Sequence, residues 1–346
     1  MNHGLFFLCA CSETDRGGIR LCRMDSPVSP PVELDLTPLP GANFLCFSHD
    51  GKTLYATSNT QADGGSAAAF RCSPDGSLKF LGSVPAGGKS ACYLTCSPDG
   101  RFLYSANYSS GSVTEFTLAE DGSITGRNRV IEHQGPCGPV KDRQEMPHTH
   151  CTVLTPDNRY LCVNDLGMDS ILLYPVTPGG LALPASEWKA EPGEGPRHIL
   201  FDGSGEYAYV VNELASSVTM LHYSDGKLER LGSLSTLPPD CHTKTKAAAI
   251  RFSPDGRFLF ATNRGFDSIA CFRIVSPGSL ELTDIVSSRG SSPRDFQFLP
   301  GGRTAAATNE FSDQVCLFDY EAETGTLRYR EGADLTDLPR PLYIAF

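Results

Sequence analysis

The sequence predicts an all-β fold, a seven-bladed β-propeller of four-stranded antiparallel blades that forms a single domain over residues 1–346. Two observations support this prediction: a strand–turn–strand motif recurs along the chain, and its copies are evenly spaced. The clearest copy spans residues 252–264, FSPDGRFLFATNR. In its turn Pro254 restricts φ, Asp255 forms local hydrogen bonds and Gly256 accepts positive φ. The residues that follow have high β propensity and alternate in size, as in a half-buried strand.

Six copies of the motif are visible. Their turns centre on Gly51, Gly100, Asn158, Gly205, Gly256 and Gly302. Five intervals therefore cover positions 51 to 302, about 50 residues each, a period typical of propeller blades. One unit divides into four expected strands at residues 248–253, 257–262, 268–274 and 279–286, joined by short turns.

The length of 346 residues accommodates seven such units, and the two ends of the chain supply the seventh. Residues 339–346 match the approach to an innermost strand and then stop. Residues 5–10, 18–24 and 31–36 match the other three strands of a blade. We therefore expect residues 343–346 to pair with residues 5–10 and close the ring, which removes the exposed sheet edges. The alternative is a six-bladed ring with frayed ends.

Composition narrows the class of partner and the compartment. A net charge of −11 argues against nucleic acid or an anionic membrane as the main partner. The sequence contains no run of 18 or more apolar residues, so we expect no membrane span. The apolar residues 5–10 are few and follow no Lys or Arg, so they are expected to form a strand and not a signal peptide. Thirteen Cys without a CxxC pair fit reduced thiols in a cytoplasmic protein. We expect a monomer or weak homo-oligomer.

Antiparallel pairing indicates where the chemistry should be. In each blade the innermost strand starts at the same end at which the second strand finishes, so these positions ring one mouth of the axial channel. Cations gather at the starts of the innermost strands: Lys89, His148, Arg197, Lys246, Arg294 and Arg340. The second strands end in polar residues: Asn59, Asn107, Asn164, Asp165, Asn212, Glu213, Asn263, Arg264, Asn309 and Glu310.

Such a concentration of cations in an acidic protein would focus a small anionic substrate on this mouth. The alternative is structural. Glu213 could pair with Arg197 or Arg264, Asp295 could pair with Arg294, and the repeated Asn residues could cap turns. The long segment 133–147 and the loop 235–245 both lead into this mouth and are expected to flank it.

His148 and His150 lie two residues apart, so on a strand they share one face. An HxH pair can bind a metal, but no third ligand is evident, so we expect no metal site. Proton transfer by His148 is the better-supported function, because an imidazole can exchange protons near neutral pH.

Six segments depart from the plain repeat or extend it: RQEMPHTH, NDLGMDS, GPRHILF, VNELASSV, SPDGRFLFATNRGFDSI and SPRDF. In this order and spacing they resemble the seven-bladed propeller lactonase family, which includes bacterial 6-phosphogluconolactonases and fungal carboxy-muconate lactonising enzymes. The resemblance covers essentially the whole chain. It implies an enzyme that acts on a sugar-acid lactone without a cofactor. It also implies a catalytic set of His148, Arg197, Glu213 and Arg264. Phe266 departs from the pattern, since a His is common at that position.

Around this set we predict substrate contacts at His150, His198, Arg294, Arg340, Asn107 and Asn309. Opening a lactone requires an activated water and a stabilised oxyanion. Glu213 or His148 could accept the proton, while Arg197 and Arg264 could hold the oxyanion or the anionic end of the substrate. A serine nucleophile is unsupported because no GxSxG motif is present.

The expected function is hydrolysis of 6-phospho-D-glucono-1,5-lactone to 6-phosphogluconate, a step of the pentose phosphate pathway. Two alternatives remain open. One is a cycloisomerase that forms or opens a muconolactone with His148 protonating carbon, and the other is a propeller that only binds.

Overall fold

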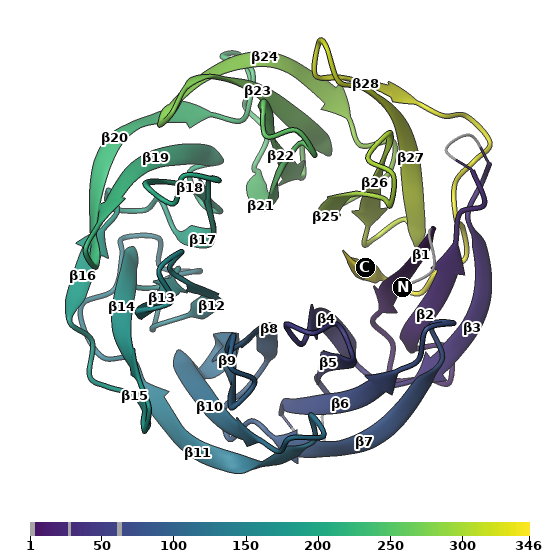
Figure 1. The fold of residues 1–346 in the computed structure, drawn as a ribbon. Helices are drawn as coiled ribbons and strands as arrows, with labels where there is room; N and C mark the ends of the chain where they lie inside the picture. The colour runs from purple at the N-terminus through teal and green to yellow at the C-terminus, as the bar shows by residue number, and fades with distance from the viewer. Residues whose placement is uncertain (1–3, 27–28, 61–63) are drawn as a thin grey trace.

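The computed structural model describes residues 4–26, 29–60 and 64–346 and shows seven blades arranged around one axis (Figure 1). Six of the blades are four-stranded antiparallel sheets, and one carries a fifth short strand. This arrangement confirms the predicted seven-bladed propeller and excludes the six-bladed alternative. The only helix in the described residues is the 3-10 turn η1 (Tyr108–Ser110), and no helix there is long and apolar enough to cross a membrane.

The blades follow one another along the chain. The blade that contains both ends of the chain consists of β29 (Pro341–Ala345), β1 (Leu5–Ala10), β2 (Gly18–Arg23) and β3 (Val32–Pro38). The next two consist of β4 (Ala42–Phe47), β5 (Thr53–Ser58), β6 (Ser66–Cys72) and β7 (Leu78–Pro85), and of β8 (Ala91–Cys96), β9 (Phe102–Asn107), β10 (Ser112–Leu118) and β11 (Ile124–Glu132).

The five-stranded blade consists of β12 (Thr149–Leu154), β13 (Tyr160–Asp165), β14 (Ser170–Thr177), β15 (Gly180–Leu181) and β16 (Ser186–Lys189). It is followed by β17 (Pro196–Phe201), β18 (Tyr207–Asn212), β19 (Ser217–Ser224) and β20 (Lys227–Ser235). The last two blades consist of β21 (Lys246–Phe252), β22 (Phe258–Arg264), β23 (Ser268–Ser276) and β24 (Ser279–Ser287), and of β25 (Pro293–Phe298), β26 (Thr304–Asn309), β27 (Gln314–Glu321) and β28 (Thr326–Tyr329).

The two ends of the chain close the ring, as predicted. Strand β29 pairs antiparallel with β1, so that Tyr343 lies opposite Cys9 and Ile344 opposite Leu8. Figure 1 shows the yellow C-terminal strand beside the purple N-terminal strands of the same blade. The predicted strand at 5–10 is therefore present, and the innermost strand of this blade comes from the other end of the chain.

The recurring turn is held by its own side chains. In the copy after β21, the hydroxyl of Ser253 accepts a hydrogen bond from the Phe258 amide (2.9 Å) and donates one to Asp255 (2.6 Å). The same hydroxyl-to-amide bond recurs at Ser48 and Ser97. This local hydrogen bonding explains why the motif was recognisable in the sequence.

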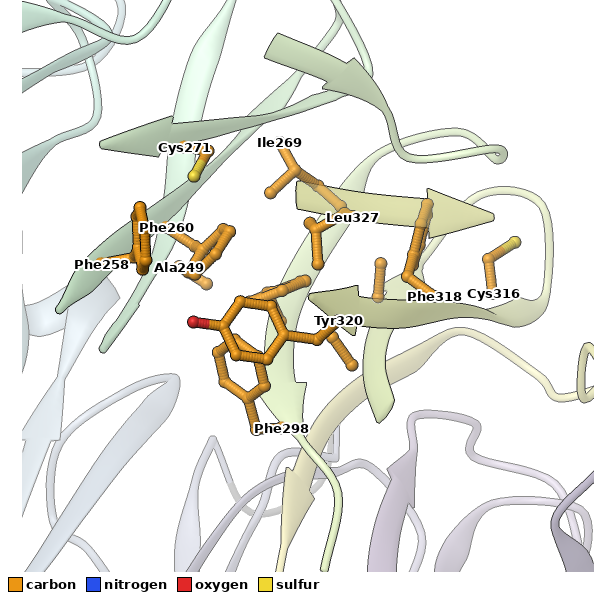
Figure 2. Packing of buried hydrophobic residues seen from close by; sticks show 13 residues of the cluster. Ala249, Phe258, Phe260, Ile269, Cys271, Phe298, Cys316, Phe318, Tyr320 and Leu327 are labelled. Atoms are coloured by element: carbon orange, nitrogen blue, oxygen red, sulfur yellow. The ribbon is translucent and has the colours of Figure 1, made fainter. Parts of the chain in front are cut away.

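Each blade packs its faces against its two neighbours. Figure 2 shows one such layer, in which aromatic residues of the β21–β24 blade meet those of the β25–β28 blade. The ring of Phe260 lies 5.2 Å from that of Phe296 and 6.0 Å from that of Tyr320, between centroids. Burial of these large rings is the main stabilising contribution at the interface, on the order of 2–3 kcal/mol for each fully buried Phe.

All seven innermost strands share a β-bulge near their start. In each, the innermost strand has one residue more than the second strand, as between Pro293 and Asp295 in β25, which face Asn309 and Thr308. In β4 and β21 the interruption spans two residues opposite one, and the extra residue is taken as the one at the position of Arg294. A bulge leaves the extra residue out of the ladder and re-aims its side chain. The extra residues, called the bulge ring below, are Asn43, Cys92, His150, Arg197, Ala248, Arg294 and Leu342.

Candidate active site

Three arginines converge on one buried carboxylate at the predicted mouth. Glu213 follows the end of β18 and is 1 % exposed. Its carboxylate oxygens lie 2.6 Å from Arg143, 3.1 Å from Arg197 and 2.7 Å from Arg264. The structure thus brings together three of the four residues predicted to be catalytic, and adds Arg143 to them.

The electrostatics of this cluster fix the charge of Glu213. Burial alone would raise the pKa of its carboxyl, but the guanidinium groups of Arg264, Arg197 and Arg143 outweigh burial and hold the pKa well below its usual range. Burial and the nearby charges of Arg294 and Arg264 lower the pKa of Arg197 to about 9. Glu213 is therefore a poor proton acceptor at neutral pH, and its chemistry is that of a fixed counter-charge that orients the arginines.

His148 lies at the same mouth and is joined to Glu213 through two residues. Its ring stacks on Tyr108 with centroids 4.4 Å apart. The Tyr108 hydroxyl accepts a hydrogen bond from Arg143 (2.7 Å), and Arg143 in turn contacts Glu213. His148 Nδ1 donates to the Tyr108 carbonyl (2.9 Å), so in the neutral imidazole Nε2 carries the lone pair. Nε2 lies 3.1 Å from the carboxylate of Glu145, which is positioned to stabilise the ring once it is protonated.

The segment between β11 and β12 is fastened at both ends, which fixes the position of His148. At its start the side chain of His133 pairs with Asp165 (2.8 Å) and contacts the Tyr174 hydroxyl (3.0 Å). All three side chains are buried. The same Asp165 carboxylate accepts the backbone N–H of His148 (2.8 Å). The buried Gln144 amide donates to Leu166 (2.9 Å). A buried network of this kind holds the imidazole in one place.

The position of Glu213 depends on a left-handed glycine. Gly195 has φ +63°, and a Cβ there would approach Leu214 to 2.7 Å, so this site favours glycine. Its carbonyl accepts the Glu213 N–H (2.8 Å), while its own N–H donates to Asp169 (2.7 Å). The GPRH and NEL segments are therefore joined directly, with Arg197 on one and Glu213 on the other.

Below this cluster the bulge ring lines a narrow space on the axis. Its walls include Asn43, Cys92, His150, Arg197 and Arg294. His150 and His198 are buried there, and burial together with the charge of Arg197 lowers the pKa of both imidazoles well below the usual range. Both rings are therefore neutral near pH 7 and serve as hydrogen-bonding groups.

Aromatic rings close the channel under the bulge ring. Phe44 lies 4.1 Å from Tyr93 and 4.1 Å from Tyr343, between ring centroids. Phe44 and Tyr343 also border a separate cavity of about 530 Å³ at the opposite mouth, so the same rings form the wall between the two spaces. The larger cavity is lined by side chains such as Cys46, His49 and Phe346 and by no arginine. Charge, and not volume, locates the candidate site.

The remaining predicted contacts divide into two groups. His150, His198 and Arg294 lie in the axial space beneath the arginine cluster. Arg340 instead pairs with Glu310 at the edge of the mouth, with 55 % of its side chain exposed. Asn107 and Asn309 are fully buried, and their amides donate within and between blades, to Thr114 (2.9 Å) and to the Ser288 carbonyl (3.1 Å). The structure does not bring these three to the cluster. The alternative of turn-capping Asn describes Asn107, whose amide also donates to Ser112 across the turn after β9 (3.1 Å), whereas Asn309 links two blades.

The predicted position of the two long loops is confirmed. Asp142 of the first loop and Lys244 of the second lie 3.4 Å apart, so both border the same mouth. Residues 4–26, 29–60 and 64–346 contain no group of three or more His, Cys, Asp or Glu side chains arranged to hold a metal ion.

The sequence reasoning missed Arg143 and Tyr108. Arg143 lies in the long segment, outside the repeat, and Tyr108 follows the end of β9 in a 3-10 turn. A signal for Arg143 was present, since it begins the segment RQEMPHTH that also contains His148. For Tyr108 the only signal in the sequence was its position next to Asn107, at the end of a second strand.

The chain belongs to the family of lactonases with a seven-bladed β-propeller, whose model matches residues 7–346. Among curated proteins it is 34 % identical to the 6-phosphogluconolactonase of Bacillus subtilis, over 88 % of this chain and 86 % of that protein.

Two solved structures are similar over nearly their whole length. A periplasmic gluconolactonase from Pseudomonas aeruginosa has a TM-score of 0.93 and 29 % identity, covering 99 % of this chain and 98 % of that one. A protein from Lactobacillus plantarum has a TM-score of 0.91 and 30 % identity, covering 100 % and 99 %. These relatives share the fold of this chain and include enzymes that act on gluconolactones.

Proposed function

We propose that this protein is a lactone hydrolase that converts 6-phospho-D-glucono-1,5-lactone to 6-phosphogluconate. The observation that supports it most is the arginine cluster around Glu213 beside a histidine with a fixed tautomer. The similarity to the Bacillus subtilis enzyme supports the same substrate. An acidic protein that concentrates guanidinium groups at one mouth has a site for a small anion.

In the proposed reaction His148 is the general base. A water molecule near Nε2 loses a proton to the imidazole as its oxygen attacks the lactone carbonyl carbon. Glu145 stabilises the resulting imidazolium. The oxyanion that forms is stabilised by Arg197, which is already oriented by Glu213. The bond between the carbonyl carbon and the ring oxygen then breaks, and the ring oxygen receives the proton back from His148.

The test is a coupled assay on freshly generated 6-phosphogluconolactone, with spontaneous hydrolysis subtracted. The unphosphorylated glucono-1,5-lactone and a muconolactone serve as parallel substrates, because one structural relative is a gluconolactonase. Faster turnover of the phosphorylated lactone supports the proposal. The absence of enzyme-dependent hydrolysis, or a preference for the muconolactone, would contradict it.

We propose a cytoplasmic location for the same protein. In support, all thirteen Cys are free thiols in the structure, and seven of them, including Cys9 and Cys162, are buried or nearly so. Free thiols in this number are typical of a reducing compartment. Cell fractionation with compartment markers tests this proposal, and recovery in a periplasmic fraction would contradict it.

A further inference from the structure

The bulge ring contains two arginines with a small residue between them. Arg197, Ala248 and Arg294 are the extra residues of three consecutive blades. Ala248 fills little of the space beside it, and its carbonyl accepts a hydrogen bond from Arg197 Nη1 (2.7 Å). The blade that contributes Ala248 also contributes Arg264, at the end of its second strand. Arg264 Nη2 donates to the carbonyl of the neighbouring Ala247 (3.1 Å), so Arg197 and Arg264 both contact the backbone at this bulge.

Two of these groups have unused hydrogen-bonding capacity. Arg264 binds Glu213 through Nη2, while its Nε is buried and has no hydrogen-bond partner among the described residues. Within the described part of the chain, Arg294 forms no ion pair, since the neighbouring Asp295 is engaged by Arg251 (2.7 Å) instead. The alternative predicted from the sequence, an Arg294–Asp295 pair, is therefore wrong.

The charges around this space are unbalanced. Arg143, Arg197, Arg264 and Arg294 carry four positive charges, and the first three share one carboxylate, that of Glu213. Asp295 also borders the space, but its charge is matched by Arg251 (2.7 Å). The charge of Arg294 acts on both Arg197 and Arg264. Burial is the main cause of the lowered pKa of Arg197 and Arg294 is the next, and Arg294 also lowers the pKa of Arg264. Guanidinium groups held close together without counter-ions are unfavourable until an anion binds between them.

We propose that Arg294, with the Nε edge of Arg264, forms the subsite beside Ala248 that binds the phosphate group of the substrate. Arg294 is then the residue that distinguishes a phosphorylated lactone from an unphosphorylated one. A phosphate dianion matches the excess positive charge, and planar guanidinium forks match its oxygens. The neutral His150 and His198 line the narrow axial space next to this subsite. This inference rests on the proposed lactonase function.

Lys246 is the main competitor for this assignment. It lies opposite Arg264 in the β21–β22 ladder, and burial with the charge of Arg143 lowers its pKa. It is at the start of its strand and, like Arg264, does not itself border the axial space where the bulge-ring side chains meet. Arg294 does border it, and we therefore assign phosphate recognition to Arg294.

The test compares Arg294→Gln with Arg303→Gln, an equivalent charge removal in the same blade at an exposed turn on the opposite mouth. Arg294→Lys and Lys246→Gln complete the set, and each variant is checked for an unchanged melting temperature. We expect Arg294→Gln to lower kcat/KM on 6-phosphogluconolactone at least about 30-fold, and on glucono-1,5-lactone less than about twofold. Arg294→Lys should recover part of the loss, and Arg303→Gln should match the wild type.

A second measurement does not depend on catalysis. Calorimetric titration with 6-phosphogluconate should show weaker binding to Arg294→Gln, with gluconate binding unchanged. Equal losses on both lactones, no loss on either, or a phosphate-selective loss only in Lys246→Gln would overturn the inference while leaving the lactonase function standing. A wild-type protein that hydrolyses neither lactone would contradict the proposed function, and the titration would still decide the subsite.

Discussion

Replacement of Glu213 by Gln tests the charge balance of the site most directly. The substitution keeps the size of the side chain but leaves Arg197, which is 3 % exposed, without its counter-ion. Removing one partner of a buried ion pair destabilises a protein by about 3–5 kcal/mol. Arg143 and Arg264 are 19 % and 13 % exposed and can turn towards solvent, so we expect the lower half of that range.

The expected shift in melting temperature follows from the size of the protein. At about 2.1 cal/mol/K per residue, the unfolding entropy of 346 residues is about 0.7 kcal/mol/K. A loss of 3–4 kcal/mol then lowers the melting temperature by about 4–6 °C. Differential scanning calorimetry of the wild type, Glu213→Gln and the exposed control Glu323→Gln at pH 7 measures this, with no change expected in the control.

The same experiment has a pH dependence with a definite sign. The pKa of Glu213 is well below its usual range in the folded protein, so its stabilising effect is fully present above the unfolded pKa, near 4.3. The effect is lost as the pH falls through the lower, folded pKa. The gap in melting temperature should therefore be constant from pH 7 to about 5 and narrow below about 4. An equal melting temperature at pH 7, or a gap that widens in acid, would refute the reasoning.

Three further predictions follow from the site and the ring. His148→Asn should lower kcat about a hundredfold to ten-thousandfold with little change in KM. Turnover equal to that of the wild type in this variant would contradict the assignment of His148 as the general base. Arg264→Ala should mainly raise KM on the phosphorylated lactone, since it removes a cation that faces the substrate, and an unchanged KM in steady-state kinetics would contradict this. Deletion of residues 339–346 should cause unfolding or aggregation, because it exposes β1 and removes the Asp295–Ile344 hydrogen bond (3.2 Å); a truncated protein that melts like the full chain would contradict it.

The fold was predictable because its information is local and repeated. The turn at Ser253 is defined by side chains within five residues, and six copies in register leave little room for another topology. Ring closure followed from the missing seventh set of strands and was confirmed by the pairing of β29 with β1.

The site was predictable only where it follows the repeat. Arg197, Glu213 and Arg264 lie at strand ends, so antiparallel geometry placed them at one mouth before the structure was known. Arg143 lies in a long segment whose path depends on the buried His133–Asp165 pair. These two residues are 32 positions apart, so no local sequence pattern predicts their contact. The bulges were equally hidden, since one extra residue at a strand start breaks the two-residue alternation that marks a strand.

The bulge ring also bears on how such a protein can change its preferred substrate. Each of its members stands outside the hydrogen-bond ladder of its blade, so its side chain is not required to hold the blade together. Residues as different as Asn43, Cys92, Arg294 and Leu342 occupy equivalent places at one depth of the channel. The scaffold thus offers seven positions, on rigid strands, at which the side chain can vary without a change in strand pairing, although Arg197 is also held by its buried ion pair with Glu213. A new selectivity would require changes in this ring and not in the blades that carry it.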